Sequence, residues 1–89
     1  SEKALYICHS NLQESIAKLK LAKKSLELAA EAIVIAREQY HLGVISFLDL
    51  LRTEEENYNA WVNLIRALNE YYLQQSTISY LLGKMVLKE

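Results

Sequence analysis

The sequence has no proline and only two glycines, Gly43 and Gly83, among its 89 residues. Proline and glycine are the residues that most often interrupt helices and form turns. Their scarcity predicts long uninterrupted helices, with one break where Gly43 falls near the middle of the chain. No segment shows the alternation of apolar and polar residues that is typical of strands.

Other scarcities narrow the class of protein. The single cysteine, Cys8, excludes an internal disulfide framework. No run of about 18 apolar residues occurs, so no helix is expected to insert across a bilayer, and the first residues do not resemble a secretory signal. A net charge of −1 gives no electrostatic case for binding nucleic acid.

Apolar and small residues recur at a three-four spacing through the first half of the chain. They are Leu5, Cys8, Leu12, Ser15, Leu19, Ala22, Leu26, Ala29, Ile33, Ala36 and Tyr40. This heptad pattern predicts a long helix with one seam against another helix, and the small members allow the two backbones to approach closely. A second stripe lies beside the first at seven-residue steps. It consists of Leu21, Leu28, Ile35 and Leu42.

The first helix is predicted to end at Gly43, because glycine readily takes the left-handed conformation at a helix C-terminus. Ser46 is a candidate N-cap for a second helix, and Asp49 follows in the spacing of a capping box. The expected elements are a helix over about 1–42, a turn over about 43–46 and a helix over about 47–83 or beyond. The predicted fold is all-α, a long antiparallel helical hairpin of the coiled-coil type.

The second helix also carries two seams. One consists of Phe47, Leu51, Tyr58, Trp61, Ile65, Leu68, Tyr72, Leu82 and Val86. The other consists of Leu50, Ala60, Leu64, Ala67, Tyr71, Ile78, Leu81 and Met85. A helix with two seams needs neighbours on two sides, and a lone hairpin supplies only one. Hydrophobic residues make up 52% of the chain, so we expect it to pack further, into a larger helical assembly.

The stretch "AREQYHLGVISFLDLL" and the later "NYNAWVNLIRALNEYYLQQSTISYLLG" together resemble the TolC-type outer-membrane efflux proteins. The resemblance covers roughly residues 26 to 83, and the first 25 residues share only the heptad character. The positions that match the family pattern are Tyr40, Gly43, Ser46, Asp49 and Leu51.

The resemblance implies a piece of a larger protein: three chains forming a periplasmic α-helical barrel below an outer-membrane pore, in a Gram-negative-type envelope. The turn would lie at the periplasmic tip, where a periplasmic adaptor (membrane fusion) protein docks on Leu42, Gly43 and Val44 and drugs or metals enter for export. Asp49 matches the first of two aspartates at the channel entrance. Arg52 stands where the second would be, which favours a mixed or salt-bridged ring.

Other interpretations remain open at the level of sequence. The two seams also suit a self-associating coiled-coil module, a dimeric four-helix bundle. Glu38 and His41 have the E-x-x-H spacing of di-metal bundles, but no carboxylate is expected opposite them, so no metal site is predicted. No serine, histidine and acid set suggests an enzyme, and no motif indicates a cofactor.

Overall fold

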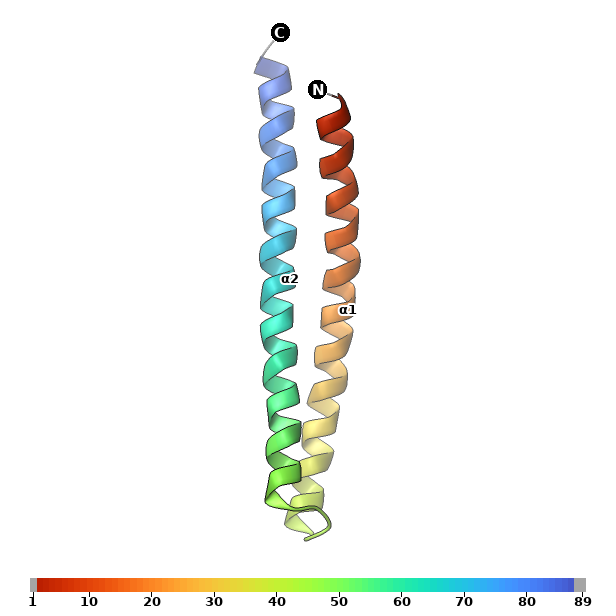
Figure 1. Ribbon diagram of the computed structural model, residues 1–89, viewed down its shortest axis with the longest axis vertical. Helices are drawn as coiled ribbons and strands as arrows, with labels where there is room; N and C mark the ends of the chain where they lie inside the picture. Colours follow the sequence, from red (N-terminus) through yellow and green to blue (C-terminus); the bar gives the residue numbers. More distant parts are fainter. Residues whose placement is uncertain (1, 88–89) are drawn as a thin grey trace.

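The chain folds into two long antiparallel helices joined by a short turn (Figure 1), as the sequence predicts. The computed structural model describes residues 2–87, with α1 at Glu2–His41 and α2 at Phe47–Leu87. The hairpin measures 70 × 14 × 14 Å, and its radius of gyration of 19.8 Å far exceeds the roughly 12 Å of a compact chain of this length. Most of each helix therefore faces solvent or a partner rather than a central core.

The element ends differ slightly from those expected. The first helix was expected to run to about residue 42 and ends at His41; Ser1, where the expected helix begins, lies outside the described residues. Gly83 lies inside α2, which continues to Leu87. Among the described residues only Gly43 has a positive φ. Gly83 keeps helical backbone angles and so does not terminate the helix.

Small side chains dominate the contact between the two helices. The first predicted seam of α1 is buried or half-buried from Leu5 to Ala36, and its last member, Tyr40, is exposed. The buried apolar residues are Ala22, Ile33, Ala36, Leu50, Ala60 and Ala67. Alanine on both helices lets the backbones approach closely. Ser15 is 1% exposed, and its hydroxyl donates to the Leu12 carbonyl at 2.8 Å, so this buried polar group is satisfied.

Only one of the two α2 seams faces α1. The seam that begins at Leu50 is buried or half-buried as far as Leu81, and its last member, Met85, is exposed. The seam that begins at Phe47 is exposed apart from Leu68. Asn57 lies within the inward seam, and its Oδ1 atom is buried with no hydrogen-bond partner among the described residues. Because α2 has two apolar seams and α1 covers only one of them, the other apolar face of α2 is exposed.

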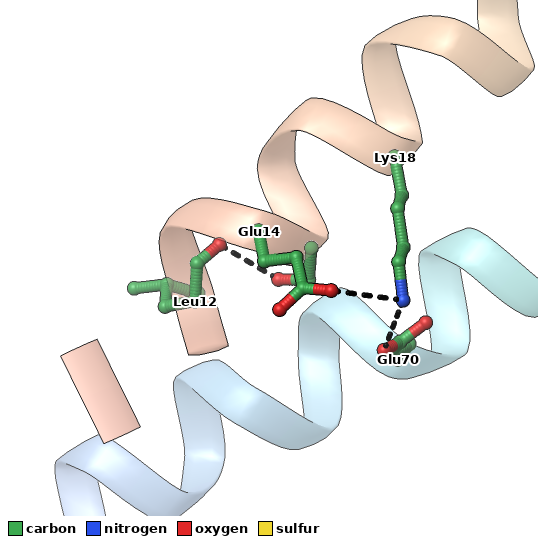
Figure 2. Close-up of polar contacts among 5 residues, drawn as sticks. Leu12, Glu14, Lys18 and Glu70 are labelled. Atoms are coloured by element: carbon green, nitrogen blue, oxygen red, sulfur yellow. Dashed lines mark hydrogen bonds and ion pairs between the residues drawn. The ribbon is translucent and has the colours of Figure 1, made fainter. Parts of the chain in front are cut away.

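Ion pairs link the helices at two levels. Lys18 lies 3.5 Å from both Glu70 on α2 and Glu14 on its own helix (Figure 2). The charge of Glu70, and then that of Glu14, raises the pKa of Lys18 above its ordinary 10.5. Nearer the turn, Arg37 and Glu54 approach to 3.8 Å. These side chains are exposed, and such pairs contribute little stability, so the helices are held together mainly by their apolar seam.

Neither helix, within residues 2–87, has a stretch long and apolar enough to cross a membrane.

Candidate docking site at the closed end

The turn that closes the hairpin starts with a Schellman cap built around Gly43. The Gly43 amide donates to the Tyr40 carbonyl at 3.0 Å, and the Val44 amide donates to the Gln39 carbonyl at 2.8 Å. This pair of bonds satisfies two carbonyls at the end of α1. Gly43 has φ of 75°, a left-handed conformation that L side chains adopt only with strain. The prediction that the first helix ends at Gly43 through a left-handed C-terminal cap is confirmed.

A reciprocal capping box begins α2. The Asp49 amide donates to the Ser46 hydroxyl at 3.2 Å, and the Ser46 amide donates to an Asp49 carboxylate oxygen at 3.4 Å. The Leu50 amide donates to the Ser46 carbonyl at 3.2 Å as the first helical bond. The Ser46 and Asp49 amides are therefore each satisfied by a side chain, as the predicted capping box requires.

Ile45 anchors the turn to the helices. It packs against the buried cluster of Ile33, Ala36 and Leu50. Ile45 precedes the N-cap and Leu50 is the fourth helical residue, so the pair forms a hydrophobic staple that fixes the angle at which the chain enters α2. The spacing of Ile45 and Leu50 on either side of the N-cap is the sequence signal that distinguishes Ile45 from its exposed neighbours in the turn.

Four apolar side chains around this turn remain open to solvent, and we name them the closed-end patch. They are Leu42, Val44, Phe47 and Leu48, exposed by 70%, 67%, 57% and 72%. Of the residues predicted to dock, Leu42 and Val44 belong to the patch and Gly43 lies between them. Leu48 was missed, because nothing in the sequence distinguishes its outward direction from that of its neighbours.

Two details show how the patch is held. Val44 is the second residue after the C-cap, which in a Schellman motif usually contacts an apolar side chain three or four positions before the C-cap. Here those two positions hold the polar residues Gln39 and Glu38. Val44 is left exposed as a result. Phe47 packs its ring against that of Tyr40, with centroids 5.9 Å apart. The patch therefore rests on a turn that is capped on both sides.

Asp49 and Arg52, the predicted entrance residues, lie three residues apart in the first turns of α2 and both are exposed. The Asp49 carboxylate takes part in the capping box. No ion pair joins it to Arg52 in the part of the chain that the structure describes. The structure thus gives Asp49 a local helix-starting role and leaves the Arg52 guanidinium available to another chain.

Glu38 and His41 are both exposed at the end of α1. Residues 2–87 contain no group of three or more histidine, cysteine, aspartate or glutamate side chains placed to hold a metal ion. The closed-end patch combines a turn capped on both sides with apolar side chains that are largely open to solvent. In comparisons with known proteins, no family model, no curated protein and no solved structure matches this chain.

Proposed function

We propose that this hairpin is the periplasmic tip segment of a TolC-type outer-membrane efflux channel. Its closed end would dock to a periplasmic adaptor protein and form the entrance for drug or metal export. The segment would act as a passive conduit and docking surface in the periplasm, within a trimeric parent, without itself entering the membrane. The observation that carries this proposal is the closed-end patch.

Exposed apolar side chains gathered at one place are typical of an interaction surface. Here they lie at the end of a hairpin 70 Å long, where a partner approaching along the hairpin axis would meet them first. The Schellman cap, the capping box and the Ile45 staple hold the backbone beneath them. A surface ordered before binding loses less conformational entropy on docking.

The long sides of the hairpin are also compatible with a barrel wall. The second stripe of α1 consists of Leu21, Leu28, Ile35 and Leu42, and each of these side chains is exposed. The seam of α2 that begins at Phe47 is exposed as well. In a wall of helices each member touches one neighbour on each side, so both apolar edges would be covered by adjacent helices. Asp49 and Arg52 would then shape the entrance near the turn.

Binding to a purified adaptor protein of a tripartite efflux pump tests the proposal. Leu42→Lys places a charge in the closed-end patch, and Leu73→Lys makes the same change at the similarly exposed Leu73, far from the turn. We expect Leu42→Lys to weaken adaptor binding at least about tenfold, corresponding to about 1.4 kcal/mol, and Leu73→Lys to leave it unchanged. Gly43→Leu should also weaken binding while both helices persist.

Circular dichroism of each variant checks that its helix content is kept. Equal adaptor affinity for wild type, Leu42→Lys and Gly43→Leu would refute docking through the closed end. Equal weakening by Leu42→Lys and Leu73→Lys would refute it too, because the effect would then come from surface charge and not from the patch.

A further inference from the structure

We infer that α2 of one chain packs antiparallel against α1 of a neighbouring copy, with the closed ends of both hairpins at the same level. The contact joins the second stripe of α1 to the seam of α2 that its own α1 leaves exposed, named here the α2 outer stripe. The inference rests on the barrel wall of the proposed function and names the neighbour within it. The α2 outer stripe consists of Phe47, Leu51, Glu54, Tyr58, Trp61, Ile65, Leu68, Tyr72, Gln75, Ser79, Leu82 and Val86.

Both stripes carry large apolar side chains that the hairpin itself does not cover. On α1, Leu21, Leu28 and Ile35 are 68%, 54% and 58% exposed, and on α2, Tyr58 and Trp61 are 67% and 53% exposed. Apolar residues at this spacing form the seam of a helix against another helix. Packing α2 on α2 and α1 on α1 would need two different contacts, whereas packing α2 on α1 covers both stripes with one repeated contact.

Contacts within the hairpin establish which residues of the two helices are level. Ala22 and Ala67 line one stretch of the groove between α1 and α2. Antiparallel helices advance in opposite directions by equal steps, so Leu21, just before Ala22, is level with Leu68, just after Ala67. A neighbouring copy whose closed end is at the same height has the same levels, so its Leu21 also comes level with Leu68 of the first chain.

At this height the polar interruptions of the two stripes coincide. Continued by seven-residue steps towards the N-terminus, the stripe of α1 reaches Glu14 and then Ile7, and Glu14 comes level with the polar Gln75. Small residues of α1 also lie opposite large residues of α2. The layers are Ile7 with Leu82, Glu14 with Gln75, Leu21 with Leu68, Ser25 with Ile65, Leu28 with Trp61 and Ala32 with Tyr58.

A shift of one heptad in either direction, about 10 Å, removes this match. In one direction Glu14 faces Leu82 and Leu21 faces Gln75. In the other, Glu14 faces Leu68. Both shifts place a polar group against an aliphatic side chain, where it loses water without gaining a hydrogen bond. The sequence of the two stripes therefore favours neighbours with their closed ends level.

Glu14 can make this contact without giving up its ion pair. Its Oε1 atom lies 3.5 Å from Lys18 of the same helix. A carboxylate has two oxygens that accept hydrogen bonds, so Oε2 is left to accept from the side-chain amide of Gln75 in the neighbouring copy. The polar layer is thus satisfied between chains.

Glu54 likewise stays with its own chain. Its carboxylate lies 3.8 Å from Arg37 of α1, and the inferred contact leaves that pair in place. The neighbouring copy presents the apolar Ile35 at the height of Glu54. In antiparallel knobs-into-holes packing, Ile35 enters the space between Leu51 and Tyr58, which lie one turn away on either side.

The contact joins two different surfaces, so each chain offers one stripe and receives the other. A heterologous contact of this kind repeats around a ring when its rotation closes, as the proposed trimeric wall requires. All closed ends then point the same way, and Leu42 of one chain comes level with Phe47 of the next. The closed-end patches of neighbouring chains adjoin in a single rim.

Disulfide cross-linking between two variant chains tests the contact, in a Cys8→Ser background and a glutathione redox buffer in which disulfides exchange. One chain carries Glu14→Cys and the other Gln75→Cys, so the thiols lie in one layer. Leu21→Cys with Leu68→Cys forms a second matched pair. We expect both mixtures to give covalent heterodimers. Absence of heterodimers from both mixtures would overturn the inference.

The same four variants provide the controls. Glu14→Cys mixed with Leu68→Cys, and Leu21→Cys mixed with Gln75→Cys, are each displaced by one heptad, about 10 Å, and should not cross-link. Each variant alone should give no covalent homodimer, because neither stripe meets itself. Equal cross-linking of matched and displaced pairs, or homodimers in place of heterodimers, would refute the inferred packing.

A charge within the contact tests the apolar layers. Leu28→Glu, added to the chain with Glu14→Cys, should reduce cross-linking to Gln75→Cys at least about tenfold, because it buries an unpaired charge against Trp61. Leu73→Glu, at an exposed position outside both stripes, should leave it unchanged. Circular dichroism checks that both variants stay helical. Equal yields from Leu28→Glu and Leu73→Glu would contradict packing through these stripes.

Adaptor binding is measured separately on the wild-type chain and Leu42→Lys. Matched cross-links with no effect of Leu42→Lys on adaptor binding would support the packing and refute docking through the closed end. Adaptor binding that depends on Leu42, without matched cross-links, would refute the packing alone.

Discussion

The two glycines of this chain should respond to alanine in opposite directions. Gly43 has φ of 75°, and a Cβ built on it meets nothing within 4 Å. Gly83 also has open space around a built Cβ, but its backbone is helical. Steric contact is therefore the same at both sites, and backbone conformation alone distinguishes them.

The expected magnitudes follow from that difference. A left-handed conformation costs an L-residue about 1–2 kcal/mol, so Gly43→Ala should lower the free energy of unfolding by about that amount. Alanine in a helix is favoured over glycine by roughly 0.5–1 kcal/mol, so Gly83→Ala should raise it, towards the lower figure because the site is near the helix end. For a domain of this size 1 kcal/mol moves the melting temperature by about 4–8 °C.

Urea unfolding followed by circular dichroism at 222 nm measures both changes. All samples need the same protein concentration, since any self-association makes stability depend on concentration. Unchanged m-values would show that the same amount of surface is exposed in each variant. If Gly43→Ala stabilised the protein as Gly83→Ala does, the Schellman turn described here would be wrong.

Three further changes test other parts of the hairpin. Ser46→Ala should cost about 1 kcal/mol in urea unfolding by removing the N-cap acceptor, and a neutral result would contradict the capping box. Asn57→Leu should stabilise by about 1 kcal/mol, because it replaces a buried carbonyl oxygen without a partner; a clear loss of stability would mean that this oxygen is satisfied. Because the pKa of Lys18 is raised above 10.5 by Glu70 and Glu14, its contribution is complete below that pH and is lost as the pH rises through the folded pKa. Melting temperatures of wild type and Lys18→Gln should therefore converge above about pH 10.5, and a gap that widens there would contradict the sign of the shift.

Much of the fold could be predicted from the sequence because its main signals are local. The heptad spacing defines the seam of α1, and Gly43 with Ser46 and Asp49 defines the turn. These features depend on residues within a few positions of one another. Gly83 does not end α2, which continues to Leu87 within the expected range of 47–83 or beyond, because glycine can remain in a helix at modest cost.

The seam of α2 that faces α1 could not be predicted from hydrophobicity, since both seams are apolar. Size decides between them. Ala60 and Ala67 allow a close approach to the alanines of α1, whereas a seam containing Trp61 and Tyr58 would hold the helices apart. The exposed state of the closed-end patch likewise depends on three-dimensional packing, in which Ile45 packs against the buried cluster while Val44 stays exposed. The efflux role remains a prediction from resemblance, supported by this patch.

The most direct test of docking through the closed end is site-specific photo-cross-linking to an adaptor protein. A photoreactive label on Val44→Cys, in a Cys8→Ser background, is compared with the same label on Tyr80→Cys; the native side chains are 67% and 66% exposed. The account predicts strong cross-links from position 44, mapping to one short region of the adaptor, and few from position 80. Equal cross-linking from both positions, or none from position 44, would contradict it.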